Sequence, residues 1–227
     1  MRLVTVAHGT RHSTGNRVAA ELTRLAGTRL GLTARVSYVE LCEPLLGDVL
    51  AESAEETVVV PLLLSTGLHV RHDLPRSLED APGPVDLAGP LGPDPLLAAA
   101  QVDRLLEAGA EPGQPVVLVA AGSRDPAAST DLRIAADLLG RHWGAPVRLA
   151  TMAGLGPRVD EVVRPGDAVS PYLLAPGFFA DRAETLARAS GATVAAGPIG
   201  VHPLLADLLV ARARERLAGT TSTRIAV

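Results

Sequence analysis

The sequence lacks lysine, has one cysteine and contains few aromatic residues, and each of these shortages excludes a class of protein. All of its basic side chains are arginine, and its formal net charge of −4 offers no general basic surface for nucleic acid. The single Cys42 excludes an intramolecular disulfide and a metal site built from several cysteines. With aromatic residues at 2% and hydrophobic residues at 47%, the core must consist mainly of Leu, Val and Ala.

Long hydrophobic runs are also missing. No apolar stretch approaches the ~20 residues that cross a bilayer. The apolar start of the chain is too short for a secretory signal and leads directly into polar residues at His8. We therefore expect a soluble, cytoplasmic protein that has no contact with membranes.

The first half alternates short apolar runs with segments of helical periodicity. We predict strands at Leu3–Ala7, Val36–Leu41, Val58–Leu64 and Val85–Ala88, and helices at Gly15–Leu30, Pro44–Ala51 and Pro95–Ala108. Continuous apolar strands that alternate with helices are typical of a parallel sheet covered on both faces.

The second half repeats the first. "TVAHGTR" returns as "LVAAGSR", "CEPLLGDVL" as "LGPRVDEVV", "PLLLSTGLH" as "PYLLAPGFF" and "AGPLGPDPLLA" as "AGPIGVHPLLA", in the same order and at nearly constant separation. The Pro- and Gly-rich segment Gly109–Pro115 separates the copies. We predict an α/β protein of two similar Rossmann-like units, residues 1–112 and 113–227, each a parallel four-stranded sheet flanked by helices. A pseudo-twofold axis would relate the two units.

Differences between the copies point to function. Three potential ligands of the first half become apolar in the second: His8 aligns with Ala121, Glu40 with Ala153, and His69 with Phe179. Each lies at or just past the carboxyl end of a predicted strand, and parallel strands bring these ends to the one edge where ligands bind. Two imidazoles and a carboxylate suit divalent iron, cobalt, nickel or zinc, with coordination positions left open.

Each of these residues also has an ordinary structural explanation. A single His at a strand end is commonly hydrogen-bonded within the fold, and a single Glu there is commonly a helix cap or a solvated side chain. The joint loss of all three in the second copy favours a shared metal or catalytic site.

The segments "VAHGTR", "SYVELCEP" and "PLLLSTGLHVRHDLP" resemble the signatures of the sirohydrochlorin cobalto- and ferrochelatases, the class II tetrapyrrole chelatases. The resemblance implies ATP-independent insertion of Fe²⁺ or Co²⁺ into sirohydrochlorin, for sirohaem or cobalamin synthesis. It implies that His8, Glu40 and His69 form the metal and catalytic site. It also implies one site per chain, because the second half lacks these ligands, and the metal is substrate rather than cofactor. Two small differences are Thr10 in place of the usual Ser and the fusion of two halves in one chain.

Further residues beside these motifs are candidates for binding the carboxylate-rich macrocycle. They are Arg11, Arg71, His72 and Arg124. Guanidinium groups pair well with carboxylates, although a solvated surface position is the more common one for an arginine. Phe178 and Phe179 would either form an apolar wall for the ring or belong to the core, which is the more common place for phenylalanine.

Two other functions fit parts of the sequence. "HGTRHSTGN" faintly resembles the segment of histidine phosphatases that carries the phosphorylated His, but Ala7 stands where that family needs Arg. A non-catalytic carrier of metal or tetrapyrrole on a chelatase-like scaffold is the second alternative. No P-loop follows a strand, and we expect no organic cofactor. The sequence allows either a monomer or a homodimer.

Overall fold

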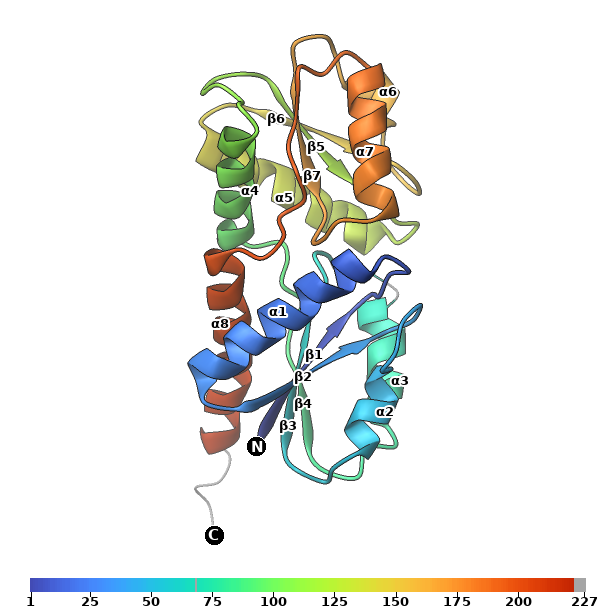
Figure 1. Ribbon diagram of the computed structural model, residues 1–227, viewed down its shortest axis with the longest axis vertical. Coiled ribbons are helices and arrows are strands. Elements are labelled where there is room, and N and C mark those ends of the chain that lie inside the picture. The colour runs from blue at the N-terminus through green and yellow to red at the C-terminus, as the bar shows by residue number, and fades with distance from the viewer. Residues whose placement is uncertain (68, 223–227) are drawn as a thin grey trace. The chain divides into compact units, whose positions relative to one another are not determined.

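The structure is a computed structural model that describes residues 1–67 and 69–222 (Figure 1). The side chains of residues 69, 70 and 219–222 lie outside this description. The chain divides into two compact units, each containing one four-stranded sheet. No helix in the described parts is both long and apolar enough to cross a membrane.

The sheet of the first unit is fully parallel and has the order β2-β1-β3-β4. Its strands are β1 (Arg2–Ala7), β2 (Thr33–Tyr38), β3 (Thr57–Pro61) and β4 (Val85–Leu87). The central strands β1 and β3 are buried along their whole length, as continuous apolar runs predict.

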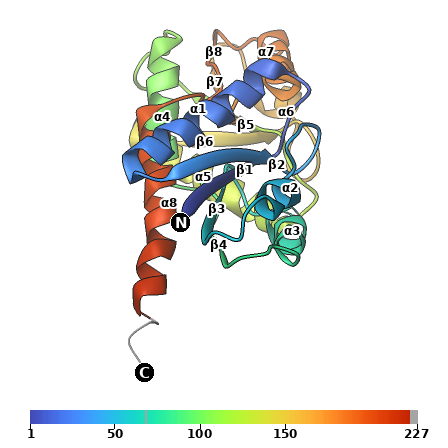
Figure 2. The ribbon, with the colours of Figure 1, turned by 60° about the horizontal axis from the view of Figure 1, so that its bottom comes forward.

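Helices cover both faces of this sheet (Figure 2). Alternate residues of β1 contact helices on opposite faces. Val4 and Val6 of β1 pack with α2 (Leu46–Ala51) and α3 (Leu74–Leu78). Between them lies Thr5, which hydrogen-bonds across the other face to Thr23 of α1 (Ser13–Leu30). The predicted two-sided burial is confirmed.

The second unit repeats this topology, with a parallel sheet in the order β6-β5-β7-β8. Its strands are β5 (Val116–Ala120), β6 (Val147–Thr151), β7 (Ala168–Tyr172) and β8 (Val194–Ala195). The helices that connect these strands are α5 (Pro126–Trp143), α6 (Val159–Val162) and α7 (Phe178–Ala189). The order of elements therefore matches the repeat that the sequence shows.

The final helix of each repeat belongs to the unit built by the other repeat. The compact units are residues 1–63, 68–91 and 205–227 on one side and 64–67 and 92–204 on the other. The helix α4 (Pro95–Glu107) packs in the second unit, where Gln101 donates to Ser170 of β7 at 2.8 Å and Arg104 donates to the carbonyl of Ile199 at 2.9 Å. The units therefore do not divide at residue 112, the boundary expected from the linker.

The helix α8 (Pro203–Ser222) lies correspondingly with the first unit. Asp207 forms an ion pair with Arg29 at the end of α1, at 2.6 Å, and Arg212 donates to the carbonyl of Pro90 at 3.1 Å. The predicted helix Pro95–Ala108 is thus correct in its extent, but it covers a different sheet from the one that precedes it in sequence.

Candidate functional site

The loops after β1 and β2 carry His8 and Glu40 to the same edge of the first sheet. The paired strands end with Ala7 opposite Tyr38. The parallel pairing then continues beyond the strands, because the Val39 N–H donates to the carbonyl of Ala7 at 2.9 Å and the Glu40 N–H donates to the carbonyl of His8 at 3.1 Å. The expected strand end at Leu41 is therefore too late, and Glu40 lies in a loop that backbone bonds hold against β1.

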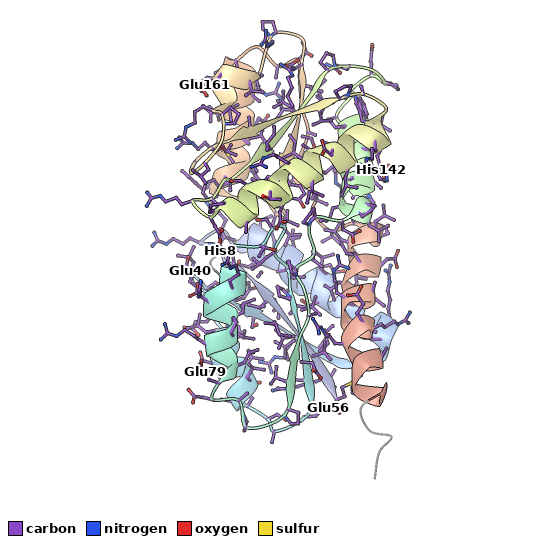
Figure 3. All side chains as sticks on the ribbon, turned by 180° about the vertical axis from the view of Figure 1, so that it is seen from behind. His8, Glu40, Glu56, Glu79, His142 and Glu161 are labelled. Atoms are coloured by element: carbon purple, nitrogen blue, oxygen red, sulfur yellow. The ribbon has the colours of Figure 1, made fainter. Side chains whose placement is uncertain are left out.

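The His8 imidazole and the Glu40 carboxylate face each other across these loops (Figure 3). Their Nε2 and Oε1 atoms are 3.6 Å apart, and the side chains are 47% and 51% exposed. Two ligands that each bind one cation at ~2.0–2.2 Å would place their donor atoms roughly 3.0–3.5 Å apart. The observed spacing is close to that range and leaves the pair open to solvent, so a cation can enter and leave from outside.

Gly9 makes this close approach of the two loops possible. Its φ of +93° is unfavourable for other residues, and a Cβ atom there would lie 1.9 Å from the carbonyl oxygen of Glu40. In the second unit, Gly122 has a φ of +88° and the same clash, at 1.8 Å from the carbonyl of Ala153. The two units therefore share one loop frame, and the second carries Ala121 and Ala153 where the first carries the candidate ligands.

The third predicted ligand, His69, has a side chain outside the described residues. Its backbone begins the π-helical turn η1 (His69–Asp73), well beyond the end of β3 at Pro61. The prediction that β3 extends to Leu64 is wrong, and His69 does not directly follow the strand. Among the side chains that the structure describes, no three His, Cys, Asp or Glu residues are grouped to hold a metal ion.

The chain leaves the sheet after β3 because its backbone acquires new partners. Residues 64–67 belong to the second unit. There the Tyr172 hydroxyl donates to the carbonyl of Leu64 at 2.9 Å, and the Thr66 N–H donates to Oδ2 of Asp131 at 2.6 Å. Burial raises the pKa of Tyr172, and the nearby Asp131 and Asp94 raise it further, so this hydroxyl remains a donor. Residues 64–67, which precede η1 in the chain, are thus held by hydrogen bonds within the second unit.

The predicted substrate-binding residues Arg11, Arg71, His72 and Arg124 are all exposed. Arg11 and Arg124 occupy equivalent loops after β1 and β5, as their places in the repeat predict. Their exposure suits binding of an anionic substrate and equally suits solvation, so their role stays a prediction.

Phe178 and Phe179 lie at the start of α7 and are 59% and 43% exposed. The expectation that they belong to the core is therefore wrong. The two rings pack edge to face with centroids 5.4 Å apart, and Leu155 after β6 is also exposed. These exposed side chains follow β6 and β7, the two strands that flank β5, at their carboxyl ends. That edge of the second sheet corresponds to the ligand-bearing edge of the first.

Sequence reasoning did not single out Asn16. This residue lies in the first turn of α1 and hydrogen-bonds to the loops that carry both His8 and Glu40. Its only signal in the sequence is that the aligned residue of the second copy is Ser129. By contrast, His12 and His142 are exposed, and His202 is buried with its Nε2 3.2 Å from Oδ2 of Asp103.

The comparisons with known proteins support the duplicated architecture. The sequence model of the CbiX family matches residues 2–108 and 115–216, one match for each repeat. A sirohydrochlorin ferrochelatase of Priestia megaterium is 28% identical over 90% of this chain and 86% of its own. A sirohydrochlorin cobaltochelatase of Methanopyrus kandleri is 30% identical over 47% of this chain and 95% of its own, so that whole relative corresponds to about one repeat.

Solved structures extend the likeness to three dimensions. SirB from Bacillus subtilis, determined with Fe³⁺, superposes with a TM-score of 0.81 at 26% identity and covers 98% of both chains. A second structure of that chelatase, from Bacillus subtilis subspecies spizizenii in complex with cobalt, has a TM-score of 0.76. With the family match covering both repeats, the duplicated topology and the candidate ligands confined to one copy, the chain belongs to the CbiX family.

Proposed function

We propose that this protein is a sirohydrochlorin chelatase, which inserts Fe²⁺ or Co²⁺ into the macrocycle without ATP. The observation that carries the proposal is the exposed pair of His8 Nε2 and Glu40 Oε1, 3.6 Å apart, on a loop frame that the second unit shares but leaves without ligands. Relatives that match both halves, or one whole half, are named as sirohydrochlorin ferrochelatases and cobaltochelatases.

The reaction exchanges one divalent cation for two pyrrole N–H protons. The protein has to hold the cation weakly enough to release it and has to accept protons as the metal–nitrogen bonds form. A neutral imidazole binds such metals less tightly than a thiolate does, and it can also accept a proton. We assign His8 and Glu40 to the cation, with His69 as a third ligand, and one of the imidazoles to proton transfer.

The macrocycle offers two kinds of surface to the protein. Its rim carries carboxylates, for which the exposed Arg11, Arg71, His72 and Arg124 supply cationic or N–H donors. Its faces are apolar, and the exposed rings of Phe178 and Phe179 supply an apolar surface in the unit that lacks the ligands.

The test is anaerobic absorbance spectroscopy of sirohydrochlorin with Fe²⁺ and, separately, with Co²⁺, without ATP and with the protein far below the concentration of the macrocycle. We expect metallation to run well past one ring per chain and faster than in a control without protein. Equal rates with and without protein would refute the proposal. Metallation or binding that stops at one equivalent would instead identify a carrier.

The same assay decides the metal, because the site chemistry accepts both ions. The larger ratio of the catalysed to the uncatalysed rate identifies the preferred cation. Independence from ATP and from organic cofactors, the monomeric or dimeric state and the cytoplasmic location stay predictions.

A further inference from the structure

Asn16 joins the two loops that carry the candidate ligands. Its Oδ1 accepts from the Thr10 N–H at 3.2 Å, and its Nδ2 donates to the Thr10 carbonyl at 2.8 Å and to Sγ of Cys42 at 3.0 Å. Thr10 lies two residues after His8, and Cys42 lies two residues after Glu40. One side chain therefore contacts both loops, and in each loop the contacted residue is two positions after the candidate ligand.

The bonding capacity of this amide matches its surroundings. An asparagine side chain has two N–H donors and one carbonyl acceptor, and the contacts to Thr10 and Cys42 use both donors and the acceptor. A serine hydroxyl has a single donor and an alanine has none. The backbone carbonyl of Asn16 also accepts from the hydroxyl of Tyr38, the last residue of β2, at 3.3 Å. The backbone and the side chain of Asn16 thus contact residues on either side of Glu40, Tyr38 before it and Cys42 after it.

The second unit joins the equivalent loops in a different way. There the Leu155 N–H donates directly to the carbonyl of Ser123 at 2.8 Å. In the repeat, Leu155 aligns with Cys42, Ser123 with Thr10, and Ser129 with Asn16. In the first unit the Thr10 carbonyl accepts from the Asn16 side chain, so at this level of the two loops an amide takes the place of the backbone bond found in the second unit.

We propose that Asn16 is a positioning residue that sets the separation of His8 and Glu40, an inference that rests on the function proposed above. The amide keeps the two loops at the spacing that places Nε2 and Oε1 3.6 Å apart. Without it the two loops keep the backbone bond from the Glu40 N–H to the His8 carbonyl but lose their side-chain bridge, and the two donor atoms are no longer held where they share one cation. Residues that hydrogen-bond directly to metal ligands typically change metal affinity or activity 10–100-fold when they are removed, and we expect an effect of that size from a side chain that joins the two ligand loops.

The experiment titrates Co²⁺ alone into the full chain and records the d–d absorption bands. The variants are Asn16→Ala and Asn16→Ser, with Ser129→Ala as the matched control at the aligned position of the second unit. His8→Ala and Glu40→Ala define the site, and the double variant Asn16→Ala/Glu40→Ala completes a mutant cycle. Thermal midpoints report the fold of every variant, and Asn16→Ser, which retains a hydroxyl, serves if alanine at position 16 prevents folding.

We expect Asn16→Ala to weaken Co²⁺ binding about 10–100-fold and to alter the d–d bands, while Ser129→Ala changes neither. In the Glu40→Ala background the further loss from Asn16→Ala should be less than about twofold, because the carboxylate that Asn16 positions is already gone. Wild-type affinity and spectrum in folded Asn16 variants would overturn the inference, as would an equal loss in both backgrounds. If His8→Ala and Glu40→Ala also bind Co²⁺ like the wild type, the proposed site itself is wrong.

Discussion

Gly9 and Glu40 approach so closely that a single methyl group at residue 9 would lie 1.9 Å from the carbonyl oxygen of Glu40. The contact sets the position of the His8 loop against the Glu40 loop. Because Gly122 makes the same approach to Ala153 in the second unit, the chain contains an internal control for any experiment on this frame.

Gly9→Ala and Gly122→Ala should therefore distinguish the effect of this loop contact on stability from its effect on metal binding. The substitution forces a residue with a side chain into a left-handed conformation and into a backbone clash, which should cost at least about 1–2 kcal/mol of unfolding free energy. Gly122→Ala should cost a similar amount, but only Gly9→Ala should also abolish Co²⁺ binding in folded protein. Denaturant unfolding and metal titration measure the two effects, and equal metal affinities in the two variants would contradict the proposed location of the site.

Removal of either candidate ligand should leave a folded protein that does not insert metal. His8→Ala and Glu40→Gln replace exposed side chains, so the unfolding free energy should change by less than about 0.5 kcal/mol. The kcat/KM for metallation of sirohydrochlorin should fall at least about 100-fold, the usual scale for a lost acid–base group. His12→Ala is the control, because His12 is exposed on the same segment and its side chain makes no capping bond to α1. A loss in this control equal to that of His8→Ala would show that the segment, and not the His8 imidazole, matters.

Phe178→Ala and Phe179→Ala test the apolar surface of the second unit. A buried phenylalanine replaced by alanine costs about 3–5 kcal/mol, whereas these exposed rings should cost less than about 1 kcal/mol. The KM for the macrocycle should rise, with little change in Co²⁺ affinity measured without macrocycle. Ile134→Ala on α5, where the side chain is also exposed, is the control. An unchanged KM in both Phe variants would exclude these rings from the substrate site.

Arg11→Ala and Arg124→Ala test the binding of the carboxylate rim by equivalent positions of the two repeats. Loss of one charged hydrogen bond should raise the KM for the macrocycle roughly 5–30-fold, corresponding to about 1–2 kcal/mol. The difference from the wild type should shrink as salt is added, because exposed charges are screened. Arg133→Ala, another exposed arginine of the second unit, should leave KM unchanged. If KM does not rise in either variant, both guanidinium groups are solvated surface groups.

Tyr172 should make the free energy of unfolding decrease at alkaline pH. An unfolded tyrosine ionises near pH ~10, whereas burial raises the pKa of Tyr172 well above that value in the folded chain. Above about pH 10 the unfolded chain therefore releases a proton that the folded chain retains, and stability falls by up to about 1.4 kcal/mol per pH unit for this group. Below about pH 10 both the folded and the unfolded chain keep this proton, so Tyr172 causes no loss of stability there.

Tyr172→Phe should remove this part of the pH dependence. At pH 8 the variant should be less stable by about 1 kcal/mol, because the carbonyl of Leu64 loses its donor. Tyr38 is the only other tyrosine, and burial raises its pKa too, so Tyr38→Phe shows how much of the slope belongs to that residue. Denaturant unfolding between pH 8 and about pH 11 measures the slopes. Identical slopes in wild type and Tyr172→Phe would contradict the raised pKa of Tyr172.

Much of this architecture follows from the sequence by itself. Apolar runs as continuous as that of β1 specify a strand buried on both faces, and the repeated segments specify that the second unit has the topology of the first. His8 and Glu40 of the first copy correspond to Ala121 and Ala153 of the second, so the sequence assigns the candidate ligands to one copy. Because the carboxyl ends of parallel strands share one edge of a sheet, the sequence also predicts that these residues lie close together.

Only the tertiary structure decided which partner each segment acquires. Periodicity reports that one face of α4 is buried, but not which sheet covers it, and the similar starts of α4 and α8 allow either assignment. Likewise, nothing local in residues 64–67 indicates that Tyr172 and Asp131 bind them, or in Asn16 that it joins Thr10 to Cys42. Such contacts link residues distant in sequence, and their stability depends on the geometry of the whole fold. The sequence pattern therefore specifies the helices, the strands and the candidate ligands, whereas tertiary packing decides which segments contact one another.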